Sequence, residues 1–124
     1  MDGLIIKQPW TDFIMAGMKD WEIRKTGCWA HLDQEILILE SGTRMARGIV
    51  KVVGCEKIVS AKSYRENFSH HRYDIPEIPA FLPYGNRTYA WKFELIRVFD
   101  NPIPYKYKRG AQIWIKDVEL ELPL

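Results

Sequence analysis

Four side chains able to do polar or stacking chemistry lie close together in the stretch AGMKDWEIR, residues 16–24: Lys19, Trp21, Glu22 and Arg24. In an extended strand alternate side chains share a face, so Glu22 and Arg24 project together. A carboxylate and a guanidinium paired in a partly desolvated cleft orient each other and leave donors and acceptors for a planar polar ligand. A solvent-exposed pair contributing less than about 1 kcal/mol has the same spacing, and the pattern leaves both interpretations open.

Aromatic side chains could supply the flat faces on which a nucleobase stacks, at roughly 1–3 kcal/mol per base. The candidates are Trp21 beside the charged pair and Tyr89 and Trp91 in the stretch TYAWKFELIRVF, residues 88–99. Trp91 also shares a predicted strand face with Phe93, a pattern typical of the core. Both roles stay open for Trp91.

Basic residues form two local groups in a chain whose formal net charge is only +2. So small a charge gives no strong overall field, so contact with nucleic acid needs a local arrangement of cations. Arg44 and Arg47 lie in SGTRMARG, a predicted loop between strands. Lys106, Lys108 and Arg109 alternate with tyrosines in YKYKRG. The second group combines charge with stacking faces and is the better candidate for phosphate contact, although a solvated turn has a similar composition.

The elements that position these residues are predicted mainly as strands. Apolar or alternating stretches predict strands at 3–7, 19–24, 35–40, 48–59 and 88–99, with one or two more in 111–122. Helices are predicted at 8–17, which ends in a glycine, and at 60–73, which opens with serine. Segment 74–86 has three prolines and predicts a loop. This order favours an α+β, mainly β fold: a small mixed β-barrel of about five to six strands with two or three short helices.

Length and composition predict one domain over residues 1–124, because a chain of this size with 47% apolar residues can bury a single core. The chain has no secretory leader pattern and no apolar run near 18 residues, so we expect no membrane segment and a cytoplasmic location. Cys28 and Cys55 are too few for a disulfide framework, and no cysteine or histidine has zinc-ligand spacing. No metal or other cofactor is therefore expected. The sequence sets no oligomeric state.

Four further aromatic or histidine residues have a structural interpretation. Trp10 falls on one helix face with other apolar residues and is predicted in the core, as is Trp114 in QIWIK. His70 and His71 are predicted as exposed residues near the end of the polar helix.

Several of these residues also carry a resemblance to a known family. Gly17, Lys19, Glu22 and Arg24 fit the pattern Gly-x-Lys-x-x-Glu-x-Arg, and the tail YAWKFELIRVFDNPIPYKYKRGAQIWI is similar to that of one branch. The chain therefore resembles ASCH domains over nearly its whole length, and the resemblance implies a PUA-like barrel. It also implies RNA, a nucleobase or a modified nucleoside as partner, bound where the charged side chains face a hollow at the barrel mouth.

The resemblance leaves alternatives to a binding module. Some small bacterial ASCH proteins are N4-acetylcytidine amidohydrolases and others are ribonucleases. In the amidohydrolases the functional set includes a lysine and a threonine three residues later; here Lys19 is followed by Glu22, so the hydroxyl is missing. If the chain is an enzyme, Lys19 and Glu22 are the catalytic candidates, with Lys19 as base or nucleophile and Glu22 transferring a proton. The neighbouring carboxylate favours the charged ammonium and opposes this use of Lys19. The third possibility is a protein-interaction module, as in larger coactivators, with an apolar patch around IPAFLPY.

Overall fold

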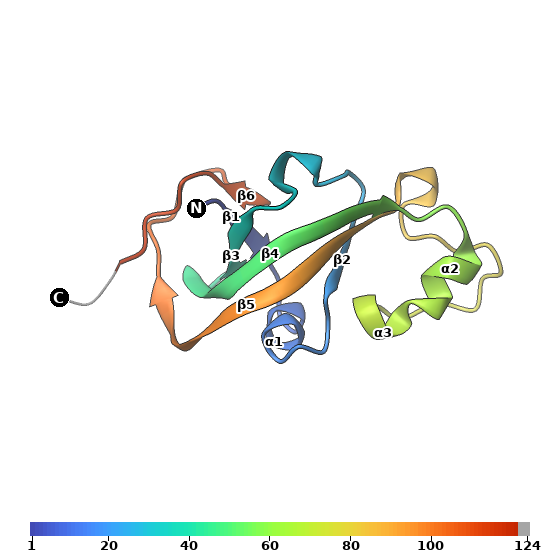
Figure 1. The fold of residues 1–124 in the computed structure, drawn as a ribbon, viewed down its shortest axis with the longest axis horizontal. Coiled ribbons are helices and arrows are strands. Elements are labelled where there is room, and N and C mark those ends of the chain that lie inside the picture. The colour runs from blue at the N-terminus through green and yellow to red at the C-terminus, as the bar shows by residue number, and fades with distance from the viewer. Residues whose placement is uncertain (122–124) are drawn as a thin grey trace.

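A computed structural model describes residues 1–121 and contains one curled sheet of six strands with short helices beside it (Figure 1). The strands are β1 (Gly3–Ile6), β2 (Trp21–Arg24), β3 (Glu35–Glu40), β4 (Met45–Lys57), β5 (Tyr89–Pro104) and β6 (Trp114–Ile115). The helices are α1 (Trp10–Met15), α2 (Ala61–Glu66) and α3 (Phe68–His71), with single 3₁₀ turns η1 (Trp29–His31) and η2 (Gly85–Arg87). The strand order is β2-β5-β4-β3-β1-β6, with only β1 and β3 parallel among these pairs. The mainly β fold class predicted from the sequence is confirmed.

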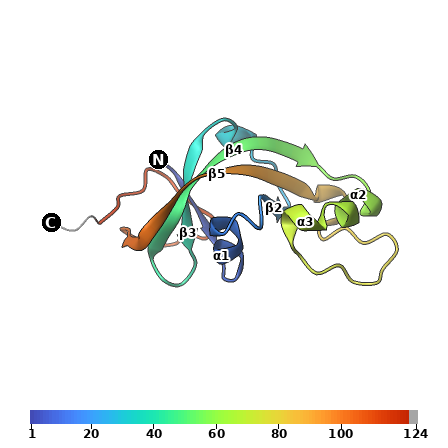
Figure 2. The same ribbon diagram turned by 60° about the horizontal axis from the view of Figure 1, so that its bottom comes forward.

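The long strands β4 and β5 give the sheet its curvature. They pair antiparallel from Met45 and Pro104 at one end to Lys57 and Tyr89 at the other. The register shifts three times along this ladder, and each such irregularity bends and twists the pair locally. Figure 2 shows the two strands arching over α1, which lies on the concave side of this half-barrel.

Apolar side chains are buried on both faces of the central strands. In β3, Ile36 and Ile38 belong to a core group with α1, whereas Leu37 and Leu39 pack on the opposite face near β6. A third, smaller group joins α2 and the loop after α3 to β2 and β5, around the ring of Tyr64. Figure 1 shows α2 and α3 together at the β2 end of the β4–β5 ribbon. These helices and the loop thus cover the end of the sheet at which the charged strand β2 lies.

Some strand boundaries differ from the predictions. The strand predicted at 88–99 continues to Pro104, and the connection after it is correspondingly shorter. Because β2 pairs with β5 only from Tyr89 to Lys92, the later part of β5 has an edge without a partner strand, where proline is tolerated. β4 begins at Met45, so Arg47 lies in a strand and not in a loop. Of the one or two strands predicted at 111–122, the described residues contain only β6. Residue 122, the last of the predicted range, lies outside the described residues.

The helix predicted at 60–73 is two helices separated at Asn67. The side chain of Ser60 accepts a hydrogen bond from the Ser63 amide and caps α2, as the serine pattern predicts. The prediction for His71 was wrong: this side chain is buried, and its ring stacks on that of Tyr64 with centroids 4.2 Å apart. The helix is interrupted at Asn67, and His71 at the end of the separate helix α3 packs between the rings of Tyr64 and Tyr73.

Two glycines of β4 provide a test of how tightly the curved ribbon is packed. A Cβ atom on Gly48 would lie 2.4 Å from the backbone oxygen of Arg97, whereas one on Gly54 would first meet the flexible side chain of Lys92 at 3.0 Å. We expect Gly48→Ala to lower the free energy of unfolding by about 1–3 kcal/mol, because backbone must move. Gly54→Ala, the matched control, should cost less than about 1 kcal/mol. Urea unfolding curves measure both, and equal losses would contradict this account of the packing.

Candidate functional site

A cavity of about 450 Å³ opens between β1, β2, α1 and the loop that follows α3. Its volume lies within the range of small-molecule sites in proteins. Glu22 and Arg24 lie together in its wall. The remaining lining residues are Ile5, Lys7, Trp10, Ile23, Ser41, Tyr64, Tyr73, Asp74, Phe81, Pro83, Tyr84 and Gln112.

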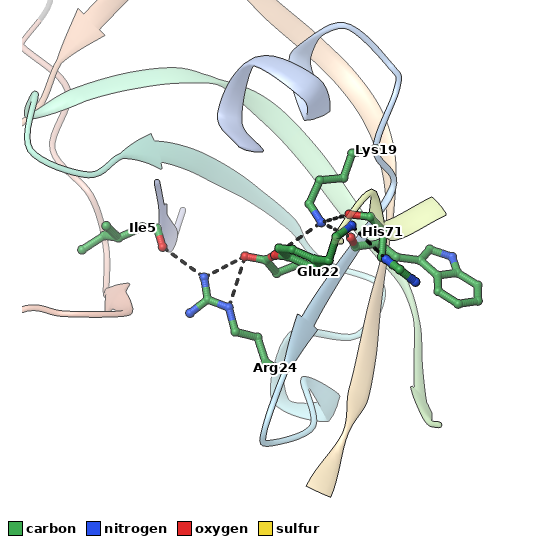
Figure 3. Close-up of polar contacts among 7 residues, drawn as sticks. Ile5, Lys19, Glu22, Arg24 and His71 are labelled. Carbon is green, nitrogen blue, oxygen red and sulfur yellow. Dashed lines mark hydrogen bonds and ion pairs between the residues drawn. The ribbon is translucent and has the colours of Figure 1, made fainter. Parts of the chain in front are cut away.

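Arg24 and Glu22 form a close ion pair on β2. Arg24 Nε and Nη2 both donate to Glu22 Oε2, at 3.2 and 2.8 Å. Nη2 also donates to the carbonyl oxygen of Ile5 in β1 at 3.3 Å, and Figure 3 shows the guanidinium between these two acceptors. Three strands separate β2 from β1 in the order of the sheet. The guanidinium therefore connects the two sides of the half-barrel across its concave face.

The carboxylate of Glu22 is buried, with only 2% of the residue exposed. Its second oxygen, Oε1, accepts a hydrogen bond from the hydroxyl of Tyr73 and lies 3.4 Å from Lys19 Nζ. Burial raises the pKa of Tyr73 above its ordinary value, and the neighbouring Glu22 charge raises it further. Tyr73 is therefore a protonated donor at neutral pH. A buried carboxylate is costly unless it is paired and hydrogen-bonded, and Glu22 has partners on both oxygens.

Lys19 is buried behind this pair and does not line the cavity. Its Nζ donates to the carbonyl oxygens of Trp21 and His71 at 2.6 and 2.7 Å, as Figure 3 shows for His71. With Glu22 as the third neighbour, the ammonium has a partner for each of its hydrogens. Burial lowers the pKa of Lys19 to about 8, while the charge of Glu22 opposes this shift. Lys19 thus joins the start of β2 to the end of α3.

His71 supports Lys19 through its backbone and adopts one tautomer. Its Nε2 lies 2.8 Å from the carbonyl oxygen of Tyr64, which requires a hydrogen on Nε2. Its Nδ1 accepts a hydrogen bond from the backbone amide of Tyr73 at 3.0 Å. Both contacts are satisfied only by the neutral ring. Burial lowers the pKa of His71, in agreement with that state.

Trp91 does not line the cavity. It is 2% exposed, packs in the core with α1, and its indole nitrogen donates to the Thr26 carbonyl oxygen at 2.7 Å. Of the two roles left open for Trp91, the structure agrees with a position in the core. Its ring lies 5.8 Å from the guanidinium carbon of Arg24 and supports that side chain from behind.

Trp21 and Tyr89 are also absent from the cavity wall. Trp21 lies on the opposite face of β2 and stacks on His70, with ring centroids 4.7 Å apart. Tyr89 packs edge-on against Trp29, at 5.5 Å. The alternation of a strand explains Trp21, because a residue between Glu22 and Asp20 must point away from the face that Glu22 shares with Arg24.

Aromatic residues from elsewhere form the wall. Trp10, predicted in the core, is only partly buried and packs against Tyr73 with centroids 4.5 Å apart. Tyr64 comes from α2, and Phe81 and Tyr84 come from the proline-containing loop. The sequence analysis placed Phe81 and Tyr84 in the apolar patch IPAFLPY of a protein-interaction module and did not predict Tyr64 or Tyr73 at the site. The two aromatic residues in a loop rich in proline were the available clue, since such a loop usually carries polar residues.

The two arginines of the first basic group have structural partners. Arg47 pairs with Glu40 at 2.5 Å and with Asp12 at 2.7 Å, which joins β4 to β3 and α1. The guanidinium carbon of Arg44 lies 4.9 Å from the ring of Tyr107. Neither arginine lines the cavity.

The second basic group lies on the exposed segment between β5 and β6. Lys106 pairs with Glu119 at 3.1 Å, Lys108 donates to the carbonyl oxygen of Lys116, and Arg109 is exposed. Gln112, three residues after Arg109, lines the cavity. None of the three basic residues lines the cavity, and their role toward phosphate stays a prediction.

A comparison with models of protein families shows to which family the chain belongs. The model of the ASCH domain matches residues 4–109. The chain belongs to the ASCH domain family. Membership supports a general RNA-binding or related function. The resemblance found in the Gly-x-Lys-x-x-Glu-x-Arg stretch is thus confirmed.

Solved structures of ASCH proteins have the same fold as this domain. A serine-to-alanine mutant of ZmASCH from Zymomonas mobilis superposes with a TM-score of 0.68 at 11% identity, over 92% of this chain and 85% of that chain. ASCH from Zymomonas mobilis gives 0.58 at 12% identity, over 82% and 69%. A tyrosine-to-phenylalanine mutant of ZmASCH from the same organism gives 0.53 at 14% identity, over 82% and 71%. No curated protein matches the chain.

Within residues 1–121, the ASCH domain has no group of three or more histidine, cysteine, aspartate or glutamate side chains arranged to hold a metal ion. The same residues include no helix long and apolar enough to cross a membrane.

Cys28 and Cys55 are free thiols in contact, and the Cys28 amide donates to Cys55 Sγ at 3.0 Å.

The burial of Lys19 gives a prediction on pH. We expect its side chain to titrate near pH 8, below the ordinary 10.5, because desolvation disfavours the ammonium. Between these values the unfolded chain holds a proton that the folded chain has lost, so the contribution of Lys19 to the free energy of unfolding rises with pH. NMR of side-chain-labelled lysine measures the titration, with Lys19→Arg to assign the resonance. A midpoint above pH 10 would contradict the expectation.

Proposed function

We propose that this ASCH domain, acting as one domain over residues 1–124, binds RNA or a modified nucleoside by holding one nucleobase in the cavity beside Glu22 and Arg24. The observation that carries the proposal is a cavity of about 450 Å³ that combines a guanidinium with several aromatic rings. A single unpaired base is planar, carries polar atoms on its edge and is read in proteins by this combination of contacts. A cytoplasmic location would suit such a partner.

The aromatic residues favour a flat ligand. Trp10, Tyr73 and Tyr84 belong to different segments, and all three line the cavity. Tyr84 is 44% exposed and stands at the rim, so its ring is available to stack on a base that enters. Trp10 and Tyr73 already contact each other edge to face, which leaves them as rigid wall.

Charge near the cavity favours a ligand with phosphate attached. Lys7 lines the cavity and is exposed, and the basic segment ends at Arg109, three residues before Gln112, which lines the cavity. Lysine and arginine beside a stacking site position a nucleic-acid backbone without reading its sequence. The base would then enter the cavity while neighbouring phosphates contact the basic segment.

Amide hydrolysis is the second candidate, favoured by the low pKa of Lys19, about 8. Against it, the ammonium is buried, is held by two carbonyl oxygens and Glu22, and does not line the cavity. The burial and contacts of Lys19 are explained by a structural role, in which it holds Glu22 in place, and need no catalytic role. Release of the acyl group from N4-acetylcytidine, lost in Lys19→Arg, would put hydrolysis first.

Substitution of Tyr84 tests base stacking. We expect Tyr84→Ala to weaken binding of short single-stranded RNA by about 5- to 150-fold, which corresponds to the loss of one stack. Phe68→Ala is the control, because Phe68 is similarly exposed at 41% and does not line the cavity. Fluorescence anisotropy with labelled RNA measures both. If Tyr84→Ala and Phe68→Ala bound the RNA with equal affinity, the support for a base site would be removed. The same would follow if the domain bound no RNA and instead bound a protein partner through the exposed loop.

Neutralising the basic segment tests the phosphate contacts. The triple variant Lys106→Ala, Lys108→Ala and Arg109→Ala should weaken RNA binding to a similar extent for different sequences. It should also reduce the slope of log affinity against log salt by about 2, because three contacts to single-stranded nucleic acid release about 0.7 counterion each. Lys62→Ala, an exposed lysine of α2, is the control and should leave the slope unchanged. An unchanged slope in the triple variant would show that phosphates bind elsewhere.

A further inference from the structure

The carboxylate of Glu22 has no room for a ligand's hydrogen-bond donor. Its two oxygens together offer about four lone-pair positions. Arg24 donates to Oε2 from Nε and Nη2, Tyr73 donates to Oε1, and Lys19 Nζ lies 3.4 Å from Oε1 as an ion pair. All three partners are protein groups that hold the carboxylate in place. Although Glu22 lies in the cavity wall, both of its oxygens have protein partners and only 2% of the residue is exposed.

The inner wall does have donors to offer. Arg24 uses Nε and Nη2 for Glu22 and Ile5, and no residue within 1–121 accepts a hydrogen bond from its Nη1. Arg24 lines the cavity, and its side chain is 23% exposed. The ring of Trp91 behind the guanidinium and the two acceptors fix its plane. Arg24 thus presents two N–H groups of fixed direction.

Tyr64 adds a further hydroxyl to the inner wall. The residue is 1% exposed and lines the cavity, and its hydroxyl has no hydrogen-bond partner among the described residues. No fully enclosed side-chain nitrogen or oxygen in that part of the chain lacks a partner, so this hydroxyl keeps a small exposed area in a residue that lines the cavity. Burial raises the pKa of Tyr64 to about 12, and the group is a protonated donor at neutral pH.

The acceptors in the cavity stand at its rim. Ser41, Asp74 and Gln112 line the cavity and are exposed to solvent. Hydrogen bonds there exchange with water and contribute little to selectivity, whereas a donor left unpaired in a desolvated wall is costly. Selection therefore depends mainly on what the ligand presents to Arg24 and Tyr64.

We infer that the cavity selects a base that presents a ring carbonyl oxygen, such as uracil, cytosine or guanine, over adenine, whose corresponding edge carries an amino group. The inference rests on the proposed function and deepens it. A carbonyl oxygen accepts from the free N–H groups of Arg24. An amino group is itself a donor: the hydroxyl of Tyr64 could accept from it, whereas Arg24 could not, and the guanidinium would stay unpaired toward that edge after water is expelled.

Four short RNAs that carry one base in an otherwise abasic strand test this selectivity. The bases are hypoxanthine, unsubstituted purine, adenine and uracil, of which the first three share the purine ring. We expect hypoxanthine and uracil to bind at least about ten-fold more tightly than purine and adenine, the loss typical of one hydrogen bond to a charged group. Adenine binding as tightly as hypoxanthine would overturn the inference.

Two variants assign the selectivity to its residues. Arg24→Gln should bring the ratio of hypoxanthine to purine affinity to within about three-fold, and Tyr64→Phe should reduce it to a smaller extent. Arg97→Gln, on the exposed part of β5, is the control and should keep the wild-type ratio. Tyr64→Phe removes a single unpaired hydroxyl from the cavity wall and so decides the matter if Arg24→Gln fails to fold. An unchanged ratio in Tyr64→Phe, together with an unfolded Arg24→Gln, would overturn the assignment.

The outcomes separate this inference from the proposed function. Equal binding of all four bases, still weakened by Tyr84→Ala, would leave a base site standing and show that carbonyl recognition is wrong. Binding no tighter than that of a fully abasic strand would contradict the base site itself.

Discussion

The buried carboxylate of Glu22 is the constraint on which the concave side of this domain depends. A charge with 2% exposure is tolerated only when its neighbours replace the water that it lost. Those neighbours are Lys19, Arg24 and Tyr73, which come from the approach to β2, from β2 itself and from the residues after α3. Because each lies on a different segment, satisfying one carboxylate fixes the relative positions of all three. Removal of any one partner would leave a charge that is buried and only partly compensated.

The same pair completes the half-barrel. The sheet is open between β2 and β6, and a curled open sheet needs contacts across its concave side to hold its curvature. Arg24 supplies one by reaching the Ile5 carbonyl oxygen in β1 while it holds Glu22. The cavity is the space that remains on this side between the bridge, α1 and the loop with Phe81 and Tyr84. The cavity therefore offers hydrogen-bond donors more than acceptors. The carboxylate of Glu22 is paired with protein groups, whereas Nη1 of Arg24 has no partner among the described residues.

The sequence predicted the local part of this arrangement and missed the long-range part. Alternation along β2 was enough to place Glu22 and Arg24 on one face, since a period of two needs no knowledge of the rest of the chain. Tyr73 and His71 reach the site across more than fifty residues of sequence, and their contacts depend on how α3 turns after Asn67. No local pattern encodes that turn. Trp91 shows the converse, because its strand pattern left the core and a ligand platform both open, and only its packing partners in the folded chain place it in the core.

The burial of Lys19 changes how the charged motif is to be understood. Lysine three residues before a glutamate suggests a reactive pair, yet here the ammonium lies behind the carboxylate and the guanidinium lies in front of it. The two cations have different tasks because they have different exposure: the lysine is 1% exposed and has all its hydrogens paired, while the arginine side chain is 23% exposed and keeps Nη1. A planar guanidinium can do both, since its five donors point in fixed and different directions, whereas one ammonium cannot satisfy two carbonyl oxygens and a carboxylate and also serve a ligand. The stretch from Lys19 to Arg24 is therefore first a folding device, and its binding capacity lies in the donors that folding leaves unused.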